Sequence, residues 1–191
     1  EKHLYLTEIE WSEAWINGGE IPIYLASTYL SDERSGTQTP DENLIHESNF
    51  DVPSLEQHGI KIGKGCSNIR FINPTFNGQK HPDIHIEEYR QEDGLILSFC
   101  NNFSEEIARN LGKKCCVKIR DMELLRKKVD KQLGYKGKMG NCEYTNDHRR
   151  NHFLKSVEDS WQDEYRIFWK YSKNKKVKIP SGMAEFVAIF E

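Results

Sequence analysis

Residues 161–169 read Trp161-Gln162-Asp163-Glu164-Tyr165-Arg166-Ile167-Phe168-Trp169, a charged turn that runs directly into an aromatic, β-prone segment. Side chains two positions apart on an extended strand point to the same face of a sheet. Gln162 and Glu164 are therefore predicted to lie side by side at the entrance of a buried strand, which would aim a carboxylate into a cleft. In the alternative interpretation, Glu164 pairs with Arg166 on a solvated strand face.

The length and composition predict one globular domain. The chain has 191 residues, of which 30% are charged and 11% are aromatic, and it is long enough for one sizeable core. A single domain spanning residues 1–191 is expected, with an irregular loop region at about 47–67. No apolar run approaches the length needed to span a bilayer. The chain begins at Glu1 without a charged-then-apolar leader, so it is expected to be a piece from which targeting information has been trimmed.

The cysteines indicate a reducing compartment. There are five of them, and no Cys-x-x-Cys occurs. Several lie in apolar contexts, such as Cys100 at the end of the run that starts at Leu95. Reduced, buried, structural thiols in a cytoplasmic protein are expected.

Charge is unevenly distributed along the chain. Residues 1–110 contain 8 Lys or Arg and 19 Asp or Glu, a balance of −11, whereas residues 111–191 contain 19 and 11, a balance of +8. The basic half could contact the phosphates of a nucleotide, an RNA or a DNA. Alternatively, the two halves pack together and neutralise each other.

The order of expected elements predicts an α+β fold with a mixed or mostly antiparallel central sheet and flanking helices. Strands are expected at 3–7, 20–29, 68–72, 84–89, 94–100, 114–119, 143–145, 164–171, around Val177 and at 186–190. Helices are expected after a Thr7 cap, at 40–46, from Asn102 or Ser104 to Gly112, after Asp121 and at 147–156. Residues 136–140 are expected to form a flexible basic loop.

Several common active sites are excluded by the absence of their motifs. The chain has no Gly-x-x-x-x-Gly-Lys, no Gly-x-Gly-x-x-Gly after a strand and no Gly-x-Ser-x-Gly, which argues against P-loop, Rossmann and α/β-hydrolase chemistry. His148 and His152 are four apart on the expected helix 147–156, and Cys142 precedes them. No second ligand pair has a matching spacing, so no metal is expected.

Three short segments carry a resemblance. His3 and Tyr5 share a face of the first strand, Ser27-Thr28-Tyr29 ends the second, and Gln162-x-Glu164 opens a late strand. In this the chain resembles the ADP-ribosyltransferase superfamily. It departs from the family pattern, because no Arg lies on the first strand, Tyr5 stands where a His would be expected, and the last Ser of Ser-Thr-Ser is missing.

The resemblance implies a set of roles. Glu164 would be the catalytic carboxylate that bonds a ribose 2′-hydroxyl of NAD and stabilises the oxocarbenium-like transition state. Gln162 would be its same-face helper and would steer the acceptor. Four residues would line the nucleotide cleft: His3, Tyr5, Ser27 and Tyr29. Arg34 would hold a pyrophosphate, and Lys155 would be either a phosphate contact or a charge at a helix C-terminus.

A second resemblance covers more of the chain. The Leu-Tyr strand, the helix that ends in Gly-Gly, and the pattern formed by Lys155, Trp161, Glu164 and Arg166 look like a bacterial family known only as a domain of unknown function. Such proteins occur among phage-defence and toxin-like genes. The pattern singles out the same carboxylate but supplies no reaction.

Three hypotheses therefore follow from the sequence. The first is an NAD-dependent ADP-ribosyltransferase-like effector or toxin that acts on a macromolecular or nucleotide target. The second is a nucleic-acid-binding or nuclease module that uses the basic half and its interleaved aromatic residues, Tyr135, Tyr144, Phe153, Trp161, Trp169 and Tyr171. The third is a non-enzymatic protein-interaction domain.

Overall fold

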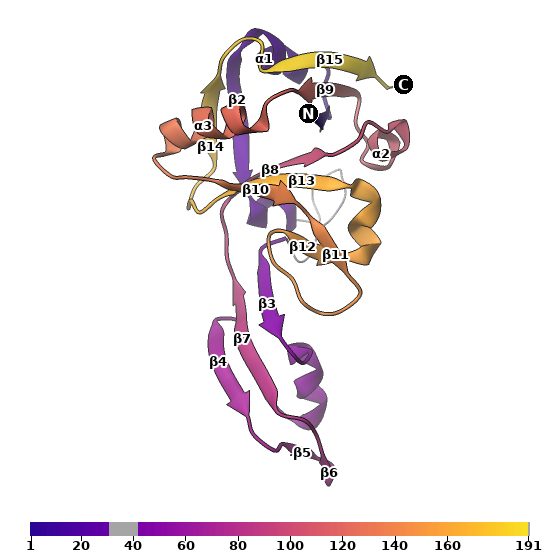
Figure 1. Ribbon diagram of the computed structural model, residues 1–191, viewed down its shortest axis with the longest axis vertical. Helices are drawn as coiled ribbons and strands as arrows, with labels where there is room; N and C mark the ends of the chain where they lie inside the picture. Colours follow the sequence, from indigo (N-terminus) through magenta and orange to yellow (C-terminus); the bar gives the residue numbers. More distant parts are fainter. Residues whose placement is uncertain (31–41, 191) are drawn as a thin grey trace.

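The computed structural model describes residues 1–30 and 42–190, and it has the α+β fold that the sequence predicts (Figure 1). Its strand pairs are antiparallel except for one parallel pair, between β11 (Glu143–Thr145) and β12 (Leu154–Ser156). The central sheet has the order β10 (Lys138–Asn141), β13 (Glu164–Trp169), β8 (Leu95–Cys100), β1 (Lys2–Leu6), β9 (Cys115–Ile119) and β15 (Ala184–Ile189). Two further strands join it through β8: β2 (Gly19–Leu25) and its partner β14 (Lys175–Ile179).

The helices form where the sequence supplies caps. Asp121 accepts a hydrogen bond from the N–H of Leu124 at the start of α3 (Met122–Leu133), and Gly134 ends this helix with a φ of 75°. Ser104 caps α2 (Glu105–Asn110) in the same way. The prediction for α1 (Trp11–Asn17) was wrong in one detail, because Glu10 rather than Thr7 occupies the cap position.

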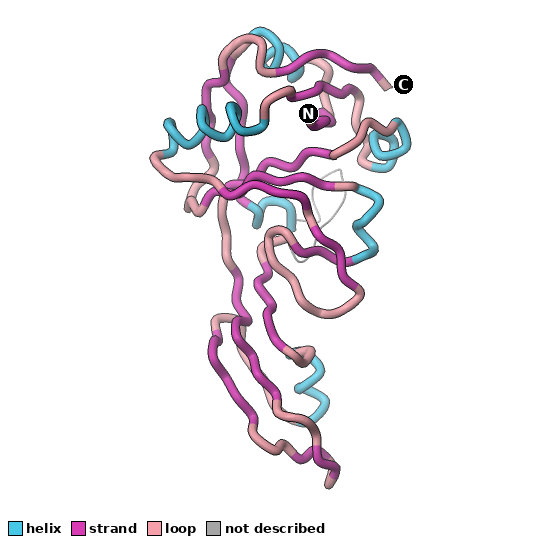
Figure 2. Tube along the Cα trace, in the orientation of Figure 1, coloured by secondary structure: helices cyan, strands magenta, loops and turns pink. Residues whose placement is uncertain are grey.

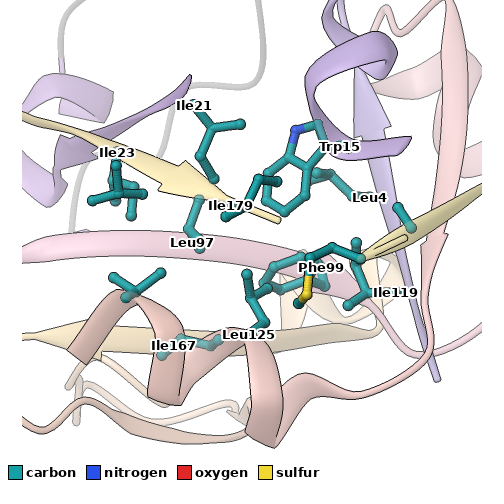
Figure 3. Packing of buried hydrophobic residues seen from close by; sticks show 14 of the residues in the cluster. Leu4, Trp15, Ile21, Ile23, Leu97, Phe99, Ile119, Leu125, Ile167 and Ile179 are labelled. Atoms are coloured by element: carbon teal, nitrogen blue, oxygen red, sulfur yellow. The ribbon is translucent and has the colours of Figure 1, made fainter. Parts of the chain in front are cut away.

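The main hydrophobic core lies between the central sheet, α1 and α3. Figure 3 shows Phe99 of β8 and Ile167 of β13 packed near Leu125 of α3, while Trp15 of α1 packs from the other direction. Trp169 of β13 is fully buried in the same cluster.

A second, smaller apolar cluster lies in an arm that projects from the body (Figure 2). The arm is a three-stranded sheet of order β3 (Leu44–Ser48), β7 (Ile84–Gln91) and β4 (Cys66–Phe71), covered on one side by the 3₁₀ helix η2 (Val52–His58). A short hairpin forms its tip, β5 (Thr75–Phe76) with β6 (Gln79–Lys80). The irregular region expected at 47–67 is therefore shorter than predicted, because strand and 3₁₀ helix occupy much of it.

Three further predictions of local structure were wrong because tertiary pairing overrides local signals. Residues 147–156 are not helical: Arg150 exchanges backbone hydrogen bonds with His46, and the Asp147 side chain accepts from the N–H of Arg149, which competes with helix formation. The helix expected at 40–46 is replaced by β3 from Leu44, and residues 40 and 41 lie outside the described part. The expected basic loop at 136–140 contributes the edge strand β10, which pairs with β13.

The second strand is also shorter than expected. It ends at Leu25, and residues 26–30 form the 3₁₀ helix η1 (Ala26–Leu30). The N–H of Ala26 donates to the carbonyl of Gly94, and the N–H of Ser27 donates to Asp93, so the chain turns away from the sheet at this point.

The central sheet is split along one edge of β8. β1 pairs with β8 only at His3 and Cys100, whereas β2 pairs with it only at Tyr24–Ile96 and Leu25–Leu95. The edge of β8 between these contacts has no strand partner in the described part of the sheet. No helix among the described residues is long and apolar enough to span a membrane.

Candidate functional site

The register of three strands places an early and a late segment of the chain close together. Cys100 of β8 pairs with His3 of β1 on one side and with Glu164 of β13 on the other. Residues that pair directly across strands project to the same face of a sheet. Glu164 therefore shares a face with His3, and Arg166 shares it with its own partner Ser98.

A tight turn starts β13 at Glu164. The 3₁₀ helix η3 (Val157–Gln162) ends at Asp163, a non-glycine residue with a φ of 44°. The Asp163 carboxylate accepts hydrogen bonds from the side chains of Asn101, at 2.8 Å, and Asn102, at 2.7 Å. These bonds hold the turn in the sparsely populated left-handed region and fix the direction in which Glu164 enters the sheet.

Glu164 lies in a buried network of charges and is only 5% exposed. Arg166 Nε donates to its Oε1 at 2.8 Å, and Lys155 Nζ lies 3.0 Å from its Oε2. Ser98, the cross-strand partner of Arg166, lies on the same face and helps to lower the pKa of the carboxylate. The Glu164–Arg166 pair expected from the sequence is thus present, but it is buried and not on a solvated face.

Arg166 connects Glu164 to a second carboxylate. Its Nη2 lies 2.6 Å from Oε1 of Glu42, which is also buried, and its Nη1 donates to the carbonyl of His152 at 3.0 Å. Three groups on different segments therefore share one guanidinium. Because a buried cation needs compensation of this kind, Arg166 is fixed in position.

Lys155 joins the two predicted catalytic side chains. Its ammonium donates to Gln162 Oε1 at 2.9 Å and to Glu164 Oε2 at 3.0 Å, and it lies 3.5 Å from Asp159. Lys155 is 3% exposed, and these partners account for its three donor hydrogens. Its alternative role as a charge at the end of a helix is wrong, because Lys155 lies on β12. Its position favours a role in holding Gln162 and Glu164 rather than in contacting a phosphate directly.

The network keeps its members charged. Burial alone would raise the pKa of Glu164, but the charges of Arg166 and Lys155 outweigh this effect and lower it to about 2. Burial lowers the pKa of Lys155, and Glu164 more than compensates, so that this pKa lies above its ordinary value. Glu164 is therefore an ionised carboxylate across the physiological pH range.

The network lies in a cleft of about 950 Å³. Six of the eight residues predicted from the sequence line this cleft: His3, Tyr5, Tyr29, Lys155, Gln162 and Glu164. Ser27 is not among the lining residues, and its backbone N–H and hydroxyl both bond to Asp93. Arg34 lies outside the described residues. The structure thus brings the early and late segments together, although they are more than 120 residues apart in the sequence.

Tyr5 and His3 lie on the α2 side of the cleft. The Tyr5 hydroxyl accepts a hydrogen bond from the N–H of Ser104 at 2.7 Å, and burial raises its pKa to about 12. The His3 ring lies 6.0 Å from the ring of Phe103, and burial lowers its pKa. His3 is therefore expected to be neutral at neutral pH, which makes it a hydrogen-bonding group and not a cation for phosphate.

Sequence reasoning missed three members of the network. Ser98 is the one polar residue in the otherwise apolar β8, and this interruption was a usable signal. The Tyr144 hydroxyl accepts from the N–H of Glu164 at 2.9 Å, whereas the sequence suggested Tyr144 only as one of the aromatic residues of a nucleic-acid-binding module. Glu42 carried no local signal, because its partner Arg166 lies far away in the sequence.

The residues considered for a metal do not converge. In the described part of the chain, no group of three or more His, Cys, Asp or Glu side chains could hold a metal ion. His148 Nε2 contacts the carbonyl of Ser48 at 3.0 Å, whereas His152 stacks on Phe168 with the ring centroids 3.7 Å apart. The cysteines are all free thiols, as expected, and all but Cys66 are buried.

Comparison of the chain with protein-family models, curated protein sequences and solved structures gives no match.

Proposed function

We propose that this chain is an ADP-ribosyltransferase-like enzyme that uses NAD and modifies a macromolecular or nucleotide target. The observation that carries the proposal is the position of Glu164. This carboxylate lies on the cleft wall, ionised and held by two cations, and the same cleft is lined by Gln162, His3, Tyr5 and Tyr29. The resemblance to bacterial defence and toxin-like proteins supports an effector role.

The cleft fits a dinucleotide in size and chemistry. Pockets for small molecules typically have volumes of about 300–1,000 Å³ and combine apolar walls with a few placed polar groups. This cleft has about 950 Å³, and its walls carry aromatic and aliphatic side chains around the charged network. The presence of aromatic side chains for flat rings and of polar groups for riboses in one cleft supports the proposal that NAD binds there.

Glu164 retains the capacity to bind a ribose hydroxyl. A carboxylate offers about four acceptor sites. Arg166 and Lys155 each use one of them, so acceptor sites are left for a ligand. With its pKa lowered to about 2, Glu164 is a poor proton acceptor at neutral pH and is suited to stabilise positive charge.

The reaction assigned to this site is a substitution at the ribose carbon C1′. NAD would supply the ADP-ribosyl group and nicotinamide as the leaving group, which departs with the electrons of the N-glycosidic bond. Glu164 stabilises the positive charge that develops on the ribose. Gln162 cannot take a proton, so its role is to orient the acceptor, whose nucleophilic atom bonds to C1′ and releases its proton to solvent.

The test is binding of NAD to the purified protein and to a Glu164→Gln variant. A ligand that binds only the folded state raises the unfolding temperature by an amount set by its concentration relative to its Kd. We expect millimolar NAD to raise the unfolding temperature of the wild type. We also expect the wild type to release nicotinamide slowly from NAD. We expect E164Q to lose nicotinamide release by about 100-fold or more, which is typical for removal of one electrostatic stabiliser.

The matched control is Glu143→Gln, because Glu143 is an exposed glutamate on the neighbouring strand β11. It should behave as the wild type in both assays. Full nicotinamide release by E164Q, or no response of the wild type to NAD, would rule out the proposed function.

A second candidate function has one observation in its favour. α3 and β14 are joined by Gln132. Its side-chain amide donates a hydrogen bond to the carbonyl of Lys178 and accepts one from the N–H of Lys178. Exposed cations from both elements therefore lie near each other: Lys127, Lys128, Lys131, Lys175, Lys176 and Lys178. Such a surface could bind a nucleic acid, either as the target of the transferase or in place of NAD.

Two other observations weaken that second candidate. Part of the basic half is neutralised within the fold, since Lys114 pairs with Glu8 and Arg120 pairs with Glu185. Trp169, one of the aromatic residues expected to stack on bases, is fully buried in the core. Strong RNA or DNA binding that falls steeply with salt, without any NAD binding, would favour the nucleic-acid module.

A further inference from the structure

Two of the four tryptophans are exposed, and one of these, Trp161 at 37%, is not a cleft residue. Trp11, the first residue of α1, is 55% exposed and lines the cleft, whereas Trp15 and Trp169 are 4% and 0% exposed and belong to the core. Indole rings are large and apolar, and their burial is favourable. A cleft that leaves one uncovered therefore offers a flat apolar surface on which a ligand ring can stack.

The same cleft carries a lysine with no partner in the described structure. Lys176 of β14 pairs with Pro22 of β2 through the backbone, and its side chain lines the cleft. No hydrogen bond or ion pair engages its ammonium among residues 1–30 and 42–190. The buried cations Lys155 and Arg166, in contrast, are fully engaged by Glu164 and its neighbours.

From these two residues we infer a subsite for an adenine nucleotide: Trp11 stacks on the adenine ring, and Lys176 contacts a phosphate. The inference rests on the proposed function, because it assigns the adenylate half of NAD to the α1 and β14 walls. The half that reacts would then lie at Glu164. Binding of a nucleotide through a stacked base and one lysine ammonium does not require a glycine-rich phosphate-binding loop. The sequence has no such loop motif.

The experiment separates the two halves of the ligand. NAD, AMP and nicotinamide mononucleotide are titrated against wild type, Trp11→Ala, Trp11→Phe and Lys176→Gln, with binding followed by calorimetry. Loss of a stacking aromatic weakens binding by about 5- to 150-fold per base. We expect this loss for AMP and NAD with W11A, a smaller loss with W11F, and no change for nicotinamide mononucleotide with either variant.

Lys176→Gln should weaken AMP and NAD and should leave the unfolding temperature unchanged, because the lysine is exposed. Tyr135→Ala is the matched control, since Tyr135 is also 55% exposed but is not a cleft residue. Its affinities should equal those of the wild type. Circular dichroism of W11A and W11F establishes that both variants are folded.

The outcomes distinguish the two proposals. Wild-type binding of NAD and AMP with unchanged affinities in W11A would overturn the adenine subsite and leave the proposed function standing. Equal weakening of AMP and nicotinamide mononucleotide by W11A would overturn the assignment of Trp11 to the base. If the wild type binds neither NAD nor AMP, both the subsite and the proposed function are overturned.

Discussion

Arg166 Nε lies 2.8 Å from Oε1 of Glu164, and the two residues are neighbours on the same face of one strand. On a solvated strand such a pair would contribute about 0–1 kcal/mol. Both side chains are buried, however, and the guanidinium also binds Glu42. The pair therefore belongs to a network that spans η3, β12, β13 and the segment before β3.

Removal of the shared cation should destabilise the fold strongly. Arg166→Met leaves Glu42 without its arginine partner and leaves Glu164 with Lys155 alone. We expect a loss of about 3–5 kcal/mol in the free energy of unfolding, as is typical when one partner of a buried ion pair is removed. Urea denaturation measures this loss. Arg149→Met is the control, because the Arg149–Asp147 pair is exposed and should contribute less than about 1 kcal/mol.

Lys155→Met should impair the site although the proposed role of Lys155 is to hold Gln162 and Glu164 and not to contact a ligand. Methionine retains the apolar stem but not the ammonium that binds Gln162 and Glu164. We expect both a lower free energy of unfolding and a loss of nicotinamide release at temperatures where the variant is folded. Lys170→Met, at a lysine whose side chain is 79% exposed, should change neither property. Normal turnover by K155M would contradict the positioning role of Lys155.

The stability should depend on pH through His152. Burial lowers the pKa of His152 to about 4, from an ordinary value of 6.5, so the unfolded chain binds a proton more readily than the folded protein. Stability is then fully present above about pH 6.5 and falls as the pH decreases towards about 4. Glu164 acts in a lower window, since its pKa of about 2 lies below that of an unfolded glutamate, and its contribution is lost below about pH 4.5.

These two windows can be separated by mutation. His152→Asn should reduce the dependence of the free energy of unfolding on pH between about pH 4 and 6.5, measured by urea denaturation at several pH values, and should leave the lower window intact. The slope that remains belongs to His3 and His46, whose pKa values burial also lowers. An unchanged slope between pH 4 and 6.5 in H152N would show that another group is responsible. Asparagine cannot titrate in this range, so the comparison isolates the imidazole.

A single methyl group should disturb the start of β8. A Cβ added at Gly94 would collide with the ring of Phe168 and would lie 2.6 Å from the carbonyl oxygen of Trp169. We expect Gly94→Ala to destabilise the protein by about 1–3 kcal/mol through overpacking. Gly63→Ala is the matched control, because an added Cβ there has no atom within 4 Å among the described residues. It should be neutral or stabilising by up to about 1 kcal/mol, measured by thermal denaturation.

The sequence predicted well those elements whose stability is local or strongly patterned. α3 has a capping aspartate, an apolar stripe and a terminal glycine, and all three are found in the expected places. The apolar run at 94–100 is the central strand β8. Predictions were wrong where the partner decides the conformation, as at residues 147–156, whose backbone is bonded to His46 on a distant strand.

The sequence by itself singled out Gln162 and Glu164 next to an aromatic strand, but the predicted reason for their approach was wrong. Gln162 ends the 3₁₀ helix η3 and Asp163 has a φ of 44°, so the two side chains are brought together by Lys155 and not by their spacing along an extended strand. Only the tertiary structure decided that Glu164 is buried, that Lys155 and Glu42 complete its network, and that His3 and Tyr5 line the same cleft. The physical reason is that these contacts depend on strand register and on the split between β1 and β2 along β8. Long-range pairing of this kind is set by the balance of the whole fold and has no signature in neighbouring residues.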